Sequence, residues 1–303
     1  MKVALIDVDG HNFPNLPLMK ISAWHKAQGD GVEWYEPLFS QDIDICYMSK
    51  VFTFTPGYDA PVNARKVIKG GTGYSYPDGG APLAQEVEHS YPDYSIYYER
   101  IPETRTTAYG FLTRGCPRGC DFCIVEHKEG KRSVKVADLS EFWRGQKNIV
   151  LLDPNMFACA EWRELSDQLI DSGAYVDFSQ GCDIRIMTEE MIEAIRRMKI
   201  KQIHFAWDRY EDKDFIVQKF QMFKDITGWN QRKLGVYVLT NFNTTHEQDV
   251  ERVETLKKLG FNPYVMIYEK EKLPTNHITR QLQRWCNNRR IFQSTRHFSE
   301  YVP

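Results

Sequence analysis

The chain has 303 residues, of which 42% are hydrophobic and 26% are charged, and its formal net charge at pH 7 is -2. This composition is that of an ordinary globular protein and excludes a disordered chain. The near-neutral charge excludes a general attraction to nucleic acid or anionic membranes. No apolar run reaches the roughly 18–20 residues of a membrane span, and the N-terminus is charged too early for a signal peptide, so we expect a cytoplasmic protein.

The N-terminal part of the chain alternates between apolar runs and turn-forming segments. Strands are predicted at 2–8, 32–35, 43–48 and 66–68. Asn15 is expected to cap a helix that ends at Gly29. This alternation favours a small, Rossmann-like, doubly wound α/β domain over residues 1–80. Residues 81–106 are rich in proline and tyrosine, so we interpret them as an ordered connecting segment rather than a flexible linker.

From residue 107 onwards, strands and amphipathic helices alternate regularly. Strands are predicted at 107–113, 148–153, 175–179, 202–207, 235–240 and 263–268. Thr188 is expected to cap one of the helices, and Thr244 with Glu247 to open another. Six such units predict a partial (β/α)6 TIM-like barrel over 107–275, followed by a C-terminal helix and tail over 276–303. In such barrels chemistry lies at the C-terminal ends of the strands.

Three cysteines follow the first of these strands in the spacing C-x3-C-x2-C: Cys116, Cys120 and Cys123. Cysteine thiolates hold iron–sulfur clusters, and three on one loop can hold three irons of a [4Fe-4S] cluster. The fourth iron would then be open for reaction. Seven cysteines, three of them clustered, fit metal ligation better than a disulfide framework. A zinc site completed by His127, and a closed cluster completed by a distant cysteine, are the alternatives.

Polar side chains follow the ends of the other predicted strands. They are Asp153 and Asn155, then Gln180, Asp183 and Arg185, then Asp208 and Arg209, then Asn241 and Asn243, and finally Glu269. Strand ends of this kind gather at one edge of the sheet, so these residues are candidates for ligand binding. Cys159 and Cys182 also follow strands. We interpret them as buried thiols, with a second cluster or a hydrogen-donating thiol as alternatives.

The C-x3-C-x2-C loop after the first of six strands, with the aromatic Phe122 before its last cysteine, resembles the signature of the radical S-adenosylmethionine superfamily. The resemblance covers about residues 107–270. It implies a [4Fe-4S] cluster whose open iron binds the amino and carboxylate groups of S-adenosylmethionine. It also implies reductive cleavage to methionine and a 5′-deoxyadenosyl radical that abstracts a substrate hydrogen. An electron donor such as flavodoxin or ferredoxin would be a partner.

The resemblance assigns roles to several strand-end residues. Family members often hold the methionine amino group with a Gly-Gly-Glu-like segment after the second strand, where this chain has Asp153 and Asn155. Gln180, Arg185 and Asp208 lie where family members contact the carboxylate or ribose, and Arg185 would suit a carboxylate through a bidentate pair. The resemblance identifies neither catalytic residues nor the substrate, which could be a small metabolite, a peptide or a nucleic acid.

The N-terminal segment, residues 1–80, resembles the cobalamin-binding module that precedes the barrel in one branch of the superfamily. Gly70 and Gly71 match a glycine pair of that module, whereas its Asp-x-His-x-x-Gly motif is missing, since Asp7 to His11 has another spacing. A cobalamin-dependent methyltransferase is therefore one alternative, and a module that only packs or shapes the substrate site is another. A non-catalytic iron–sulfur or zinc-binding protein is the alternative from a different class.

The C-terminal segment mixes cationic and aromatic side chains. They are Arg280, Arg284, Arg289, Arg290, Arg296 and His297, with Trp285 and Phe292 among them. This pattern is compatible with a nucleic-acid patch. The near-neutral charge of the whole chain favours an ordinary solvated helix end.

Overall fold

The computed structural model describes residues 1–10 and 12–302, so His11 of the expected cobalamin segment lies outside the described residues. The chain forms two compact units, residues 1–150 and residues 151 onwards. Each unit is an α/β structure with parallel strands. The domain boundaries predicted at residues 80, 106 and 275 stay predictions. No helix among the described residues is both long and apolar enough to cross a bilayer.

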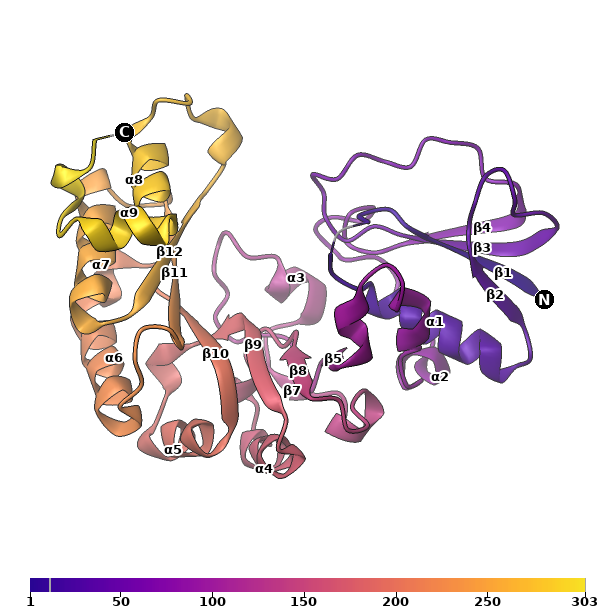
Figure 1. Ribbon diagram of the computed structural model, residues 1–303, viewed down its shortest axis with the longest axis horizontal. Coiled ribbons are helices and arrows are strands. Elements are labelled where there is room, and N and C mark those ends of the chain that lie inside the picture. Colours follow the sequence, from indigo (N-terminus) through magenta and orange to yellow (C-terminus); the bar gives the residue numbers. More distant parts are fainter. Residues whose placement is uncertain (11, 303) are drawn as a thin grey trace. The chain divides into compact units, whose positions relative to one another are not determined.

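The first unit contains a four-stranded parallel sheet with the order β2-β1-β3-β4 (Figure 1). Its strands are β1 (Lys2–Asp7), β2 (Gly31–Trp34), β3 (Ile43–Ser49) and β4 (Ala64–Gly70). The central strand β1 is buried from Val3 to Ile6, as its continuous apolar run predicts for a strand covered on both faces. The four strands predicted in this region are confirmed to within a few residues.

Helix α1 (Leu16–Ala27) covers one face of this sheet. The Asn15 side chain accepts a hydrogen bond from the Leu18 backbone N–H at 3.2 Å, which confirms the predicted cap. The opposite face is covered by side chains from the segment between β3 and β4, including Tyr58 and Val62. Among the described residues between β1 and β4, α1 is the only helix. The sheet is therefore not doubly wound, because loops replace helices on its second face.

Two glycines of the turn after β4, Gly71 and Gly73, have a packing explanation. Gly71 has a φ of +99°, and a Cβ there would clash with the backbone carbonyl of Lys50. A Cβ on Gly73 would likewise meet the Lys50 side chain. These glycines let the turn after β4 approach Lys50, whose backbone N–H donates to the Gly70 carbonyl at 3.0 Å. The predicted cobalamin site stays a prediction, to which the glycine pair adds no separate support.

Two buried tyrosines order the connecting segment. It contains α2 (Gln85–Glu88) and two short 3₁₀ turns, Tyr94–Tyr97 and Pro102–Arg105. The Tyr97 hydroxyl donates to the Asp7 carboxylate at 2.6 Å, and the Tyr94 hydroxyl donates to the Phe142 carbonyl at 2.8 Å. Burial raises the pKa of both tyrosines, so both hydroxyls stay protonated. These two hydrogen bonds tie the segment to Asp7 and Phe142, and its role as a connection between domains stays a prediction.

The strand predicted at 107–113 is interrupted. β5 (Thr107–Gly110) ends where a Cβ on Gly110 would clash with the Phe142 ring. After a short break, β6 (Thr113–Arg114) pairs in antiparallel fashion with β7 (Val134–Lys135). Between them lie the cysteines and α3 (Val125–Glu129). The cysteine loop therefore follows a short hairpin pairing rather than the end of β5.

The second unit is built of alternating strands and helices. The strands β9 (Tyr175–Cys182), β10 (Lys199–Ala206), β11 (Leu234–Thr240) and β12 (Asn262–Ile267) are parallel neighbours. The helices are α4 (Trp162–Ser172), α5 (Glu189–Arg197), α6 (Lys213–Thr227), α7 (His246–Leu259), α8 (Ile278–Asn287) and α9 (Arg289–Ser294). Within this unit the strand order is β12-β11-β10-β9, and the division between the units falls inside β8 (Asn148–Leu151). Closure into a partial barrel stays a prediction.

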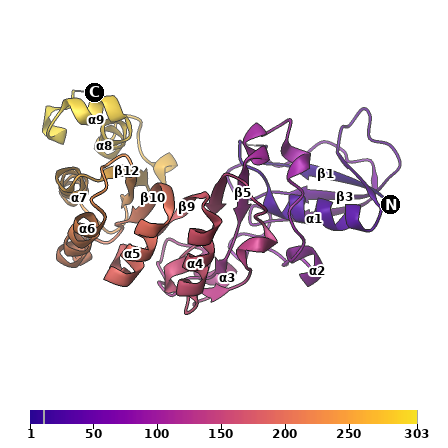
Figure 2. The ribbon, with the colours of Figure 1, turned by 60° about the horizontal axis from the view of Figure 1, so that its bottom comes forward.

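Helices α4 to α7 lie side by side against one face of the β9–β12 strands (Figures 1 and 2). Aromatic side chains fill this layer: Phe220 of α6 lies 5.9 Å from Phe205 of β10 and 4.7 Å from Phe261, measured between ring centroids. Phe205 also meets Phe223 at 4.9 Å. The burial of these aromatic rings between the helices and the sheet stabilises the fold of this unit.

Local capping chemistry explains where the helices of this unit begin and end. The Thr188 side chain accepts from the Met191 N–H, as predicted for α5. For α7 the predicted residues are one position too early: Thr245 forms the capping box with Gln248. Thr244 instead donates its hydroxyl to the carboxylate of Asp249, in the first turn of α7, at 2.7 Å.

Candidate functional site

The cysteine loop is fixed by hydrogen bonds at its base. The Cys116 N–H donates to the Gly130 carbonyl at 3.2 Å. The Glu129 carboxylate accepts from the Arg114 guanidinium at 3.2 Å and from the Gly115 N–H at 3.3 Å. Within the loop, the Cys123 N–H donates to the Cys120 carbonyl at 2.9 Å. One carboxylate and the β6–β7 pairing therefore hold the two ends of the loop together.

Glycines bend the backbone on either side of Cys116. Gly115 has a φ of +84°, and a Cβ there would clash with the Arg132 carbonyl. Gly119 has a φ of +57°, and a Cβ there would lie 2.7 Å from the Glu126 carboxylate. Only glycine adopts these conformations without strain and leaves the neighbouring groups in place. The glycines of the motif thus have a structural reason independent of any bound group.

Replacement of Gly115 by alanine is expected to destabilise the protein more than the same change at Gly145. Both residues have positive φ, at +84° and +95°, but a Cβ on Gly145 meets nothing within 4 Å. Both variants carry the conformational cost, and only Gly115→Ala adds the clash with Arg132. Thermal unfolding should show a Tm about 2–4 °C lower for Gly115→Ala than for Gly145→Ala. Equal values would show that the Arg132 contact relaxes freely.

Two of the three cysteines line a cavity of about 480 Å³. Cys120, Cys123 and Phe122 contribute to its wall, together with Tyr76 and Pro77 from the loop between β4 and α2. The remaining lining residues are Gly119, Asp121, Ile124, Glu126 and His127. All three cysteines are partly exposed, which suits thiols that must receive a metal from outside.

The donor chemistry of the loop suits an iron–sulfur cluster. Three thiols of one loop, two of them facing the same cavity, supply the sulfur ligands that such clusters use. Over residues 1–10 and 12–302, no three His, Cys, Asp or Glu side chains approach closely enough to hold a single metal ion. His127 lines the cavity, and its neighbour Glu126 pairs with Lys131 at 2.7 Å, which lowers the pKa of that carboxyl. The three-cysteine assignment stays a prediction that rests on the donor set.

In the second unit, the predicted ligand residue Arg185 is held by two carboxylates. Its guanidinium donates to Asp183 at 2.7 Å and to Asp212 at 3.2 Å. Asp183 also accepts from the Arg185 backbone N–H at 3.1 Å, which fixes the turn after β9. Arg185 is therefore oriented by two carboxylates of its own chain.

The two candidate ligand residues after β8, Asp153 and Asn155, are buried, whereas Gln180 is exposed. Asp153 is 5% exposed and Asn155 is 2% exposed, so both are oriented by the fold. Gln180 is exposed and lies within β9 rather than beyond it, because the strand continues to Cys182. The register with β10 shifts between Phe178 and Cys182, a bulge that adds residues to β9. The predicted position of Gln180 after its strand is wrong for this reason.

Charged groups gather around Asp208 at the end of β10. Burial raises the pKa of Asp208, and the nearby guanidinium groups of Arg252 and Arg185 act in the opposite direction. The Asp183 carboxylate is close enough to raise that pKa further. The structure thus brings Asp183, Arg185 and Asp208, three of the strand-end candidates, within electrostatic reach of one another.

Arg252 belongs to this group, and sequence reasoning missed it. It is completely buried on α7 and donates to the carbonyls of Trp207 at 2.6 Å and Leu239 at 2.7 Å. It also pairs with the buried Asp249 at 2.5 Å. The guanidinium thereby ties the C-terminal ends of β10 and β11 together. In the sequence, Arg252 and Asp249 are three residues apart on a polar helix, a common surface pattern. Nothing in that pattern predicts a buried arginine that binds two strand ends.

Cys159 after β8 and Cys182, the last residue of β9, are both buried, as expected. The Cys159 thiol donates to the Glu161 carboxylate at 2.9 Å. Burial, with the carboxylates of Asp153 and Asp183 nearby, raises the pKa of the Cys182 thiol, which therefore stays protonated. The burial of both side chains agrees with their interpretation as buried thiols.

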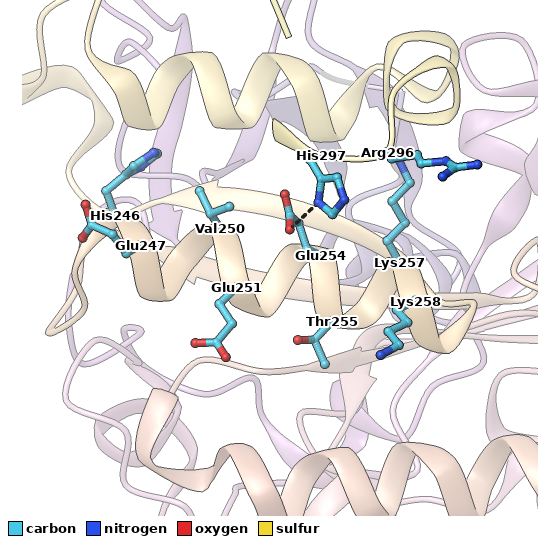
Figure 3. A pocket seen from close by; sticks show the side chains of 10 residues that line it. All are labelled: His246, Glu247, Val250, Glu251, Glu254, Thr255, Lys257, Lys258, Arg296 and His297. Carbon is cyan, nitrogen blue, oxygen red and sulfur yellow. Dashed lines mark hydrogen bonds and ion pairs between the residues drawn. The ribbon is translucent and has the colours of Figure 1, made fainter. Parts of the chain in front are cut away.

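The aromatic residues of the predicted C-terminal patch belong to the core. Trp285 and Phe292 are buried and pack on each other with centroids 4.8 Å apart. A cavity of about 620 Å³ lies nearby along α7, and in Figure 3 the glutamates lie along the first turns of the helix while the lysines, Arg296 and His297 gather at its other end. His297 contacts Glu254 at 3.0 Å, and Lys257 donates to the Phe292 carbonyl. These aromatic rings therefore offer no stacking surface to nucleic acid.

No family model matches the chain. It is similar to a CDK5RAP1-like protein of Oryza sativa subsp. japonica, with 23% identity over 162 residues. The similar region makes up 50% of this chain and 26% of that relative. The chain thus spans about a quarter of the length of the curated relative that it matches.

Proposed function

We propose that this chain is a radical S-adenosylmethionine enzyme in which Cys116, Cys120 and Cys123 hold a [4Fe-4S] cluster. The observation that carries the proposal is the glycine-bent loop with three thiols, two of which line one cavity with Phe122. The partial similarity to a CDK5RAP1-like protein supports it weakly, since it covers half of this chain. When bound and reduced, the cluster would supply the electron that cleaves S-adenosylmethionine into methionine and a hydrogen-abstracting 5′-deoxyadenosyl radical.

The chain's own residues would hold the cysteine loop in place and would bind and orient S-adenosylmethionine. The Glu129 carboxylate and the β6–β7 pairing keep the ends of the cysteine loop closed. Arg185, held by Asp183, would present its guanidinium to the carboxylate of S-adenosylmethionine. Asp153 and Asn155 would accept from its amino group, and Asp208 from its ribose hydroxyls. The substrate class stays open.

Anaerobic reconstitution tests the proposal. We expect the full chain to take up about four irons and four sulfides per polypeptide, as a [4Fe-4S] cluster requires, and to show the brown absorption of a cubane cluster. Addition of dithionite and S-adenosylmethionine should then release 5′-deoxyadenosine, measured by chromatography. Flavodoxin or ferredoxin with its reductase should replace dithionite as the electron source.

Other outcomes would favour other classes of protein. A purified anaerobic chain that contains zinc and no iron would contradict the proposal and favour a zinc-binding protein. A cluster that forms without affinity for S-adenosylmethionine would favour a non-catalytic iron–sulfur protein. Anaerobic titration with cobalamin, followed by its visible spectrum, would show whether the chain binds cobalamin, as a cobalamin-dependent methyltransferase must.

A further inference from the structure

The sheet of the second unit has two chemically different faces. The face toward the helices carries buried apolar side chains such as Phe178, Phe205 and Val238. The alternate positions on the other face are Asp177 on β9, His204 on β10, Tyr237 on β11 and Tyr264 on β12. Asp177, His204 and Tyr237 are half-buried, and Tyr264 is 50% exposed. A face that served packing alone would carry branched apolar residues at these positions.

These side chains form one ordered cluster. The His204 ring stacks on the Tyr237 ring, with centroids 4.9 Å apart and planes 8° from parallel. Tyr264 meets the edge of Tyr237 at 6.1 Å. The Tyr237 hydroxyl donates to the Ser179 carbonyl at 3.3 Å and so fixes the ring across β10. The cluster spans four adjacent strands.

A glycine makes room for the imidazole. Gly235 of β11 lies directly opposite His204 in the ladder. A Cβ at Gly235 would meet the ring, with the His204 Nε2 only 3.1 Å away. Glycine in the interior of a strand weakens the strand and often marks the close approach of another group. Here the group that approaches is the His204 side chain.

Two polar atoms of the cluster are buried without a hydrogen-bond partner among residues 1–10 and 12–302: the Asp177 Oδ1 and the His204 Nδ1. Buried polar groups are normally bonded, and leaving one unpaired is costly. Burial lowers the pKa of His204, while Asp177 and the Phe178 backbone oppose this shift. The ring is therefore neutral at pH 7. In a neutral imidazole one ring nitrogen donates and the other accepts, so the His204 Nδ1 can serve a ligand in either role, according to the tautomer.

We propose that Asp177, His204 and Tyr237 form a binding site for the N–H donor group of a flat ligand, such as an amidine or an aromatic amine. The Asp177 Oδ1 is a carboxylate oxygen and so calls for a donor, and the His204 Nδ1 can accept a second N–H in one tautomer of the neutral ring. Tyr264, half-exposed beside Tyr237, offers an aromatic edge to the flat part of the ligand. The site belongs wholly to the β9–β12 strands and does not depend on the cysteine loop.

Benzamidinium is a suitable probe, because it joins a flat ring to a group with several N–H donors. The full chain, labelled with ¹⁵N-histidine, would be titrated with it and followed by NMR. The signal lost in His204→Gln identifies His204 among the eight histidines. We expect that signal to shift at millimolar benzamidinium. Asp177→Asn should weaken binding about tenfold, because a bond to a charged acceptor is lost.

The matched control is Asp167→Asn, which changes an exposed carboxylate on α4 and should leave the affinity unchanged. Tyr264→Leu, at a half-exposed position, should weaken binding severalfold without affecting the fold. An unmoved His204 signal, which would mean that only water occupies the site, overturns the proposal. Equal affinity in Asp177→Asn and Asp167→Asn overturns it as well. Because no cluster is needed, these results are independent of iron binding and of S-adenosylmethionine cleavage.

Discussion

Replacement of Cys120 by alanine is expected to lower bound iron and released 5′-deoxyadenosine by at least about 100-fold, because loss of a residue that only supports a metal ligand already costs about 10- to 100-fold. Cys120 lines the cavity with Cys123, and its carbonyl accepts the Cys123 N–H at 2.9 Å. Alanine keeps this backbone bond and removes only the thiol. Iron analysis after anaerobic reconstitution and chromatography of the nucleoside product measure the two effects.

Cys46→Ala is the matched control within the same unit. Cys46 is a buried thiol on β3, and burial raises its pKa to about 11, so it is protonated and poorly suited to metal. Its replacement should leave iron content and nucleoside release unchanged, with a small loss of stability from the missing sulfur. If Cys120→Ala retained the iron content of the Cys46→Ala protein, the three-cysteine site would be wrong.

Replacement of Arg252 by methionine should lower the free energy of unfolding by about 3–5 kcal/mol, as is typical when one partner of a buried ion pair is removed. The change leaves the Asp249 carboxylate, 1% exposed, without its cation. It also removes the donors to the Trp207 and Leu239 carbonyls. Equilibrium denaturation in urea measures the effect.

A double-mutant cycle separates the ion pair from the carbonyl bonds. Asp249→Asn with Arg252→Met removes both charges, so the double variant should be more stable than the sum of the single changes predicts. Arg196→Met is the control, since Arg196 pairs with Glu193 at an exposed position and should cost less than about 1 kcal/mol. An Arg252→Met protein as stable as the control would show that the buried network contributes nothing to folding.

The elements that sequence predicted best are those set by neighbouring residues. Asn15 and Thr188 cap their helices because a side-chain oxygen reaches a backbone N–H within the first turn, a purely local event. At α7 the pattern fits two threonines, and Asp249 decides between them by binding Thr244. The cysteine motif is local too, so the spacing of its three thiols could be taken from the sequence.

Features that depend on contacts between residues far apart in the chain could not be predicted from the sequence. Gly110, the last residue of β5, lies against the Phe142 ring, which belongs to a segment far beyond Gly110 in the chain. The bulge that places Gln180 inside β9 follows from pairing with β10. Arg252 joins two strand ends through carbonyls that no side-chain pattern marks. For Arg185, the neighbouring Asp183 was a usable signal of an internal ion pair, whereas Asp212 was not.

The pairing of β6 with β7 has a consequence for how the cysteine loop can change over evolution. The segment 115–133 leaves and rejoins the fold at Arg114 and Val134, which are ladder partners. When both ends of a loop are clamped, doubling its length costs only about 0.6 kcal/mol of closure entropy. Insertions after Cys123 can therefore accumulate while the hairpin stays in register. The cysteine spacing and the length of the segment that follows it can thus evolve independently.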